Sequence, residues 1–133
     1  MTATEHALQL VHAAAGGAAE KKATDIIAFD VSEQLVITDA FLLCTASNER
    51  QVSAVVDEVE ERLRALGAKP VRREGERDGR WVLLDYAEIV VHVQHTDERQ
   101  FYALERLWRD CPTIDLPETD RPAAEDDPRT AEQ

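Results

Sequence analysis

The stretch WVLLDYAEIVVHVQH, residues 81–95, decides the fold of this chain. It consists of two runs rich in aliphatic and β-branched residues, at 81–85 and 89–95, separated by residues 86–88. A separation this short is typical of two antiparallel strands that form a hairpin. The sequence therefore predicts a β-sheet that contains this hairpin.

Upstream of the hairpin, three more segments are expected to be strands. Residues 25–31 form a short apolar run, and the nearly continuous apolar run at 39–47 predicts a strand that is buried on both faces. A short strand is expected at 69–73, followed by a turn at 74–80 whose two glycines supply positive φ.

Apolar residues that recur at threes and fours predict three helices. The clearest spans 48–66, with Asn48 as its N-cap and a glycine directly after its last apolar residue. A first helix at 4–22 begins at Thr4, and its two adjacent glycines weaken it or end it early. The last helix, at 96–109, has a threonine as its N-cap. Its apolar stripe is formed by Phe101, Leu104, Leu107 and Trp108.

The elements follow one another in the order α-β-β-α-β-β-β-α, the pattern of an α/β protein. A mixed β-sheet flanked by helices buries the apolar faces of such a set of elements. The chain of 133 residues is long enough for one such domain, which we expect at residues 1–110. Residues 111–133 hold four of the five prolines, and two arginines against seven acids give a net charge of 2 − 7 = −5. We expect this acidic tail to lack a fixed structure.

The whole chain carries 27 acidic residues against 15 basic ones, a net charge of −12. Extensive direct binding to nucleic acid requires clustered lysines and arginines, so this charge argues against it. An acidic protein can still reach a nucleoprotein particle by docking on one of its basic proteins. The sequence shows neither an apolar run that could span a bilayer nor a secretory signal, so we expect no membrane contact and a cytoplasmic location.

Motifs of the common enzyme classes are missing from the sequence. There is no G-x-x-x-x-G-K-[ST] phosphate loop, no G-x-G-x-x-G and no G-x-S-x-G elbow. His92 and His95 would point to opposite faces of a strand, as would Asp85 and Glu88, although a turn leaves the geometry of the two acids open. Cys44 has no second cysteine or histidine at ligand spacing and is expected to be a small buried thiol. We therefore expect no catalytic residue, no metal site and no cofactor.

Trp81 is the side chain most suited to be an interface anchor. It starts a strand after a glycine-containing turn, shares a strand face with Leu83, and is followed by Tyr86 at the strand's end. Tryptophan is enriched among the residues that dominate binding energy in protein interfaces, with a place in the core as the alternative. The surrounding acids would suit a basic partner: Glu74, Glu76, Asp85 and Glu88.

Three collinear blocks resemble the Iojap-like family of ribosomal silencing factors. They are DIIAFDV at 25–31, ITDAFLLCTASNERQVSAVVDEV at 37–59 and EGERDGRWVLLDYAEIVVHVQHTDERQFYALERLW at 74–108. The resemblance covers nearly all of residues 5–110 in order and spacing, which makes it far more specific than a single motif. It implies a fold similar to that of nucleotidyltransferases but without the catalytic motifs of that group.

The resemblance also implies a function. A protein of this family is expected to be a regulator and no enzyme, one that binds large-subunit ribosomal protein fourteen and blocks the small subunit from joining when nutrients are scarce. It is further expected to form homodimers away from the ribosome. Carried onto this chain, the ribosomal-protein-binding surface comprises Trp81, Leu83, Asp85, Tyr86, Asp39 and His92.

The chain departs from the family pattern at two points. Ala46 stands where the family commonly has glycine, and Ala87 with Glu88 stands where it commonly has glycine and aspartate. If either position needs positive φ, alanine costs free energy there. Two alternative functions stay open: a nucleotidyltransferase-like enzyme that acts on a nucleotide or tRNA with Mg²⁺, and a self-associating scaffold with Trp81 in its dimer contact.

Overall fold

A computed structural model describes residues 3–116 of the chain, except for the side chains of residues 100–102 and 105. Its centre is a five-stranded mixed sheet in which the strands follow the order β1-β2-β5-β4-β3. The β2–β5 pair is parallel, and the other three pairs are antiparallel. The strands are β1 (Thr24–Asp30), β2 (Ala40–Ala46), β3 (Arg72–Glu74), β4 (Trp81–Asp85) and β5 (Ile89–His95). The helices are α1 (Glu5–Glu20), α2 (Glu49–Ala65), α3 (Thr96–Tyr102) and α4 (Leu104–Leu107).

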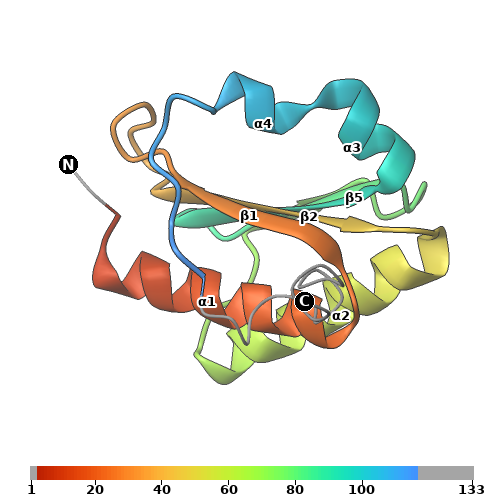
Figure 1. Ribbon diagram of the computed structural model, residues 1–133. Coiled ribbons are helices and arrows are strands. Elements are labelled where there is room, and N and C mark those ends of the chain that lie inside the picture. Colours follow the sequence, from red (N-terminus) through yellow and green to blue (C-terminus); the bar gives the residue numbers. More distant parts are fainter. Residues whose placement is uncertain (1–2, 117–133) are drawn as a thin grey trace, which may run out of the picture.

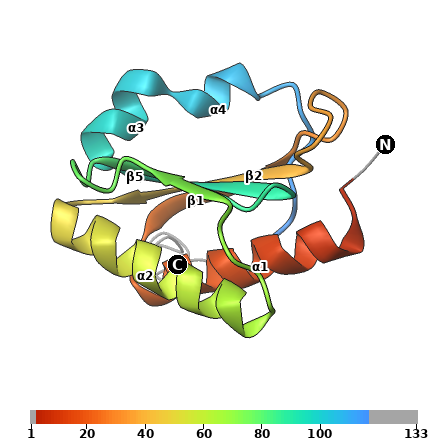
Figure 2. The ribbon, with the colours of Figure 1, turned by 180° about the vertical axis from the view of Figure 1, so that it is seen from behind.

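Helices enclose the sheet on both faces, with α1 and α2 on one side and α3 and α4 on the other, as Figure 1 and Figure 2 show. The larger apolar core lies between the sheet and the α1–α2 layer. A smaller core lies on the opposite face, where side chains of β1, β2 and α4 meet. The α/β fold and the β4–β5 hairpin predicted from the sequence are therefore confirmed, while β3 begins at Arg72 rather than at residue 69.

Both long helices begin at the caps that the sequence predicts. The hydroxyl of Thr4 accepts a hydrogen bond from the N–H of Ala7 at 3.1 Å, and the side chain of Asn48 accepts one from the N–H of Gln51 at 2.8 Å. Gly67 follows α2 with a φ of 85°, the left-handed conformation expected after the helix end. Local signals thus determine where both helices start and where α2 ends.

The glycine pair in α1 does not end the helix early, because α1 continues to Glu20. Gly17 faces α2, where a Cβ would lie 3.2 Å from Cγ of Arg62. The missing side chain therefore lets the two helices approach each other closely.

The last helix is not the single helix expected at 96–109. Ala103 adopts a left-handed conformation, with a φ of 48°, and separates α3 from α4. The expected cap, Thr96, lies inside α3, and its hydroxyl donates to a backbone carbonyl of β2 at 3.2 Å. The cap is His95, whose Nδ1 accepts from the N–H of Asp97 at 3.1 Å. The prediction of the cap was wrong because an imidazole nitrogen replaces the threonine hydroxyl.

The expected apolar stripe of the last helix holds only in part. Leu104 and Trp108 pack against the smaller core, where the Trp108 ring stands edge-on to Phe41 at 5.0 Å between centroids. Leu107 is 70% exposed, so its expected place in the stripe was wrong. The side chain of Phe101 lies outside the described residues. The left-handed conformation of Ala103 changes the direction of α4 relative to α3. Residues on either side of Ala103 therefore do not share one face, as they would in a continuous helix.

The segment after α4 continues along the outer edge of β1. The N–H of Asp30 donates to the carbonyl of Pro112 at 2.8 Å, and Leu116 is buried in the larger core. The packed structure therefore extends past the boundary expected at residue 110, because this segment covers the free edge of β1. The remainder of the expected tail, 117–133, lies outside the described residues.

Candidate functional site

β4 presents two sets of side chains to opposite faces of the sheet. Val82 and Leu84 are buried in the larger core. Trp81, Leu83 and Asp85 alternate with them and are partly exposed on the face that carries α3. α3 contacts β5 and β2 on that face, and Trp81, Leu83 and Asp85 each keep part of their surface exposed. We call these three side chains the β4 surface.

His92 forms the floor beneath this surface. It is the register partner of Leu83 and is only 6% exposed. The indole N–H of Trp81 donates to its Nδ1 at 3.2 Å. Burial lowers the pKa of His92 to about 4, so the ring is neutral at pH 7. Because Nδ1 accepts a hydrogen bond, the ring proton is on Nε2.

A hollow of about 480 Å³ opens beside the β4 surface. Trp81 and Leu83 are among its lining residues, together with the acidic residues Glu74, Asp78 and Glu98. The guanidinium of Arg80 is the basic group among the lining residues, which gives a net charge of 1 − 3 = −2. An apolar wall with a negative rim suits a lysine or arginine side chain from a partner.

Two glycines shape the turn that ends at Trp81. Gly75 has a φ of 86° and Gly79 a φ of 70°, which confirms the positive φ expected at both. A Cβ on Gly75 would lie 1.9 Å from the carbonyl oxygen of Trp81, closer than any side chain can approach. The turn therefore packs directly onto the backbone of Trp81.

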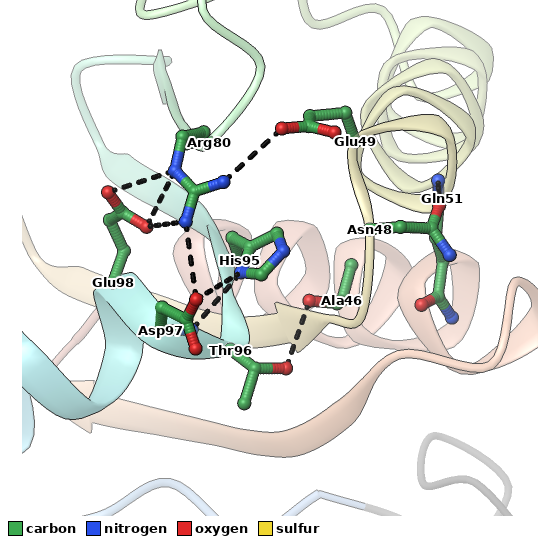
Figure 3. Close-up of polar contacts among 9 residues, drawn as sticks. All are labelled: Ala46, Asn48, Glu49, Gln51, Arg80, His95, Thr96, Asp97 and Glu98. Carbon is green, nitrogen blue, oxygen red and sulfur yellow. Dashed lines mark hydrogen bonds and ion pairs between the residues drawn. The ribbon is translucent and has the colours of Figure 1, made fainter.

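Arg80 ties the start of β4 to two helices, as Figure 3 shows. Its Nε donates to both carboxylate oxygens of Glu98 at 3.2 Å. Its Nη1 lies 3.3 Å from a carboxylate oxygen of Glu49, and its Nη2 lies 3.5 Å from one of Asp97. Its carbonyl accepts the N–H of His95 at 2.7 Å. The first turns of α2 and α3 are thus joined at the residue before Trp81.

Two of the six residues expected at the docking surface are not part of the β4 surface. Tyr86 continues the alternation of Val82 and Leu84, so it packs into the larger core and is 6% exposed. Burial raises the pKa of its phenol to about 12. Asp39 precedes β2, accepts a hydrogen bond from the N–H of Thr4 at 3.0 Å, and is separated from β4 by β5. The structure brings together the other four: Trp81, Leu83 and Asp85, with His92 beneath them.

Asp85 is itself engaged in local contacts. Its Oδ1 accepts the N–H of Ala87 at 2.8 Å, and its Oδ2 lies 3.4 Å from a guanidinium nitrogen of Arg72. The carboxylate retains 22% of its side-chain exposure. It can therefore meet a partner only at the margin of the β4 surface.

The other side chains that could take part in chemistry show no sign of a reactive or metal-binding site in the described residues. Cys44 is fully buried, its thiol lies 3.7 Å from the carbonyl of His92, and burial raises the pKa of the thiol to about 12, so the expected buried thiol is confirmed. Within residues 3–116, no three His, Cys, Asp or Glu side chains gather where they could hold a metal ion. No helix in the described part of the chain is long and apolar enough to cross a membrane.

Comparison with known proteins relates the chain to one group. A family model described as ribosomal silencing factor during starvation matches residues 4–133. A ribosomal silencing factor of Halalkalibacterium halodurans is 39% identical over 108 residues, which cover 81% of this chain and 92% of the relative. A crystal structure of a protein from Chromobacterium violaceum has a TM-score of 0.73 and 32% identity, over 76% of this chain and 84% of that one. A mouse protein named mitochondrial assembly of ribosomal large subunit protein 1 is 26% identical over 92 residues, covering 67% of this chain and 40% of its own length.

Proposed function

This chain belongs to the family of ribosomal silencing factors, and we propose that it represses translation by binding the large ribosomal subunit and keeping the small subunit from joining when nutrients are scarce. The names of its relatives support a role at the ribosome, and that of the mouse relative refers to the large subunit. The observation that carries the proposal is the β4 surface, where Trp81 stands beside an acidic hollow.

The partner that we propose on the large subunit is ribosomal protein fourteen. Its contact would centre on Trp81 and Leu83, with Asp85 at the margin. Tryptophan in such a position supplies a large apolar contact area, and a basic side chain of the partner would enter the acidic hollow. The net charge of −12 favours approach to a basic protein and disfavours extensive contact with the ribosomal RNA.

The proposed mechanism is steric and requires no covalent chemistry. A small protein that occupies part of a subunit interface prevents the much larger association for as long as it stays bound. Repression then depends on concentration and affinity, which suits a response to nutrient supply in the cytoplasm. Away from the ribosome, we propose that two copies form a homodimer. The fraction of dimer would then rise with the concentration of the free protein.

Co-sedimentation with separated ribosomal subunits, followed by a subunit-joining assay on a gradient, tests this function. The wild-type chain should pellet with the large subunit and reduce the joined ribosomes. Trp81→Ala should weaken binding about 30-fold, a loss of about 2 kcal/mol. Leu107→Ala removes a 70% exposed side chain of α4, a helix that packs with β1 and β2, and serves as the matched control. Binding to neither subunit would refute the function, whereas unchanged binding by a folded Trp81→Ala variant would refute only the site.

A further inference from the structure

The sheet beneath α3 is polar, in contrast to the apolar core on the other face. Gln94 is fully buried, and in the described part of the chain its amide oxygen and nitrogen have no hydrogen-bond partner. The same holds for Nε2 of His92. Thr45, the register partner of Gln94, accepts a hydrogen bond at 2.7 Å from Arg99 of α3, so α3 lies over these buried polar side chains. Buried polar atoms without partners cost free energy that contact with water would recover. This cost opposes the packing of α3 on the sheet, which we call its closed position.

α3 is also bounded by two points at which the backbone can turn. It is seven residues long, it starts at His95 in an extended conformation, and it ends at Ala103 with a φ of 48°. Short elements between such points can open locally at a lower free energy than the whole fold. A contact at the start of α3 would therefore add to the bonds that Arg99 and Thr96 make with β2 and help to hold the helix on the sheet.

Arg80 supplies this contact. Its guanidinium meets Glu98 through a forked hydrogen bond and also reaches Asp97, so both acids of the first turn of α3 are held. Arg80 and Glu98 retain 38% and 23% of their side-chain exposure, so the pair lies at the surface and depends on its forked, charge-assisted hydrogen bonds. Glu49 holds the same guanidinium from the side of α2, which is anchored in the larger core.

We propose that Arg80 is a positioning residue that latches α3 against the sheet and thereby fixes the docking surface beside Trp81. The link to docking rests on the proposed function, whereas the latch itself does not. Without Arg80, the start of α3 and the β3–β4 turn would have to become ordered when the partner binds. Ordering on binding lowers affinity even when no direct contact is lost.

Hydrogen exchange on the full chain tests the latch without the ribosome. In Arg80→Ala, the amides of residues 96–102 should exchange about tenfold faster, while those of residues 55–63 in the middle of α2 should keep their wild-type rates. Arg80→Lys keeps the charge but loses the forked geometry, so it should give an intermediate rate. Unchanged exchange at 96–102 in Arg80→Ala would overturn the latch.

Arg62→Ala is the matched control. Arg62 also bridges two elements through two acids, Glu20 at 2.7 Å and Glu58 at 3.0 Å, and it is 36% exposed, but it joins α1 to α2 on the opposite face. Its removal should lower global stability without changing exchange in α3. This variant separates a general loss of stability from a specific effect on α3.

Binding to purified large subunits tests the positioning role. Arg80→Ala should bind about fivefold more weakly than the wild type, although it makes the hollow more negative. Arg80→Lys keeps the charge and should recover part of the loss, and Arg62→Ala should bind like the wild type. Faster exchange in α3 with wild-type affinity would overturn the positioning role and leave the proposed function intact. If the wild-type chain itself failed to bind, the proposed function and the positioning role would both fall, and the exchange data would still decide the latch.

Discussion

The indole N–H of Trp81 donates a hydrogen bond to Nδ1 of His92 at 3.2 Å, across the paired strands β4 and β5. The bond joins a partly exposed side chain to one that is buried. It fixes the orientation of the indole and places the imidazole proton on Nε2. The geometry of the proposed anchor therefore depends on the protonation state of a residue that a partner cannot reach directly.

His92→Phe should separate stability from docking. Phenylalanine removes the acceptor for Trp81 and also removes the unpartnered Nε2, so the free energy of unfolding should change by less than about 1 kcal/mol. Binding to the large subunit should weaken about fivefold, because the indole loses its fixed orientation. Urea unfolding and co-sedimentation measure the two effects.

Trp81→Phe provides the control for that experiment, because it removes the indole N–H and keeps an aromatic ring. If the hydrogen bond matters for docking, the losses in Trp81→Phe and His92→Phe should not add in the double variant. Additive losses would show that the two residues act independently.

The stability of the protein should fall on mild acidification because of His92. Its pKa is about 4 in the folded chain against an ordinary value of 6.5. Above pH 6.5 the ring is neutral in both states; between pH 6.5 and 4 the unfolded chain binds a proton that the folded chain does not. The free energy of unfolding should therefore decrease as the pH falls through this window, by about 3 kcal/mol at most, and this contribution should level off below pH 4.

Urea unfolding between pH 7.5 and pH 4 measures this dependence, with His92→Phe as the reference for all other titrating groups. The difference between the two proteins isolates the contribution of His92. Parallel curves for the two proteins over the whole range would contradict the buried, neutral state of the imidazole.

Gly75→Ala should be far more damaging than Gly67→Ala. Both glycines have positive φ, at 86° and 85°, so each substitution costs about 1 kcal/mol or more in backbone strain. A Cβ at position 67 meets no atom within 4 Å, whereas one at position 75 would overlap the carbonyl of Trp81. We expect a loss of about 1 kcal/mol for Gly67→Ala and at least about 3 kcal/mol for Gly75→Ala. Equal losses in urea unfolding would show that the turn can move away from Trp81.

Local patterns made most of the fold predictable. The alternation of apolar residues on β4 and the short gap before β5 determine the hairpin, and the caps Thr4 and Asn48 determine two helix starts. The same alternation could have placed Tyr86 on the buried face with Val82, had it been continued past the end of the strand. No glycine or proline marks the break at Ala103, so the division of the last helix had no local signal.

The candidate site was predictable only where one strand carries it. Trp81, Leu83 and Asp85 lie at alternate positions of β4, so their common face follows from the period of a strand. The role of Arg80 was missed because its partners come from two other elements of the chain, at Glu49 and Glu98. Pairing of charges over such separations depends on the tertiary fold, and no sequence spacing encodes it.

Substitution by glycine should have opposite effects on stability at the two alanines, Ala46 and Ala87, where the resemblance implies glycine. Ala87 has a φ of 70° in the β4–β5 turn. Ala46 does not have a positive φ and is buried at the end of β2. Ala87→Gly relieves left-handed strain of about 1–2 kcal/mol and loses part of that gain through the greater entropy of the unfolded chain, so it should stabilise the protein by about 0.5–1 kcal/mol. Ala46→Gly removes a buried methyl group from a strand and should destabilise it by about 1 kcal/mol. Urea unfolding of both variants measures these changes in the free energy of unfolding. A loss of stability in Ala87→Gly would mean that the strain at this turn is negligible.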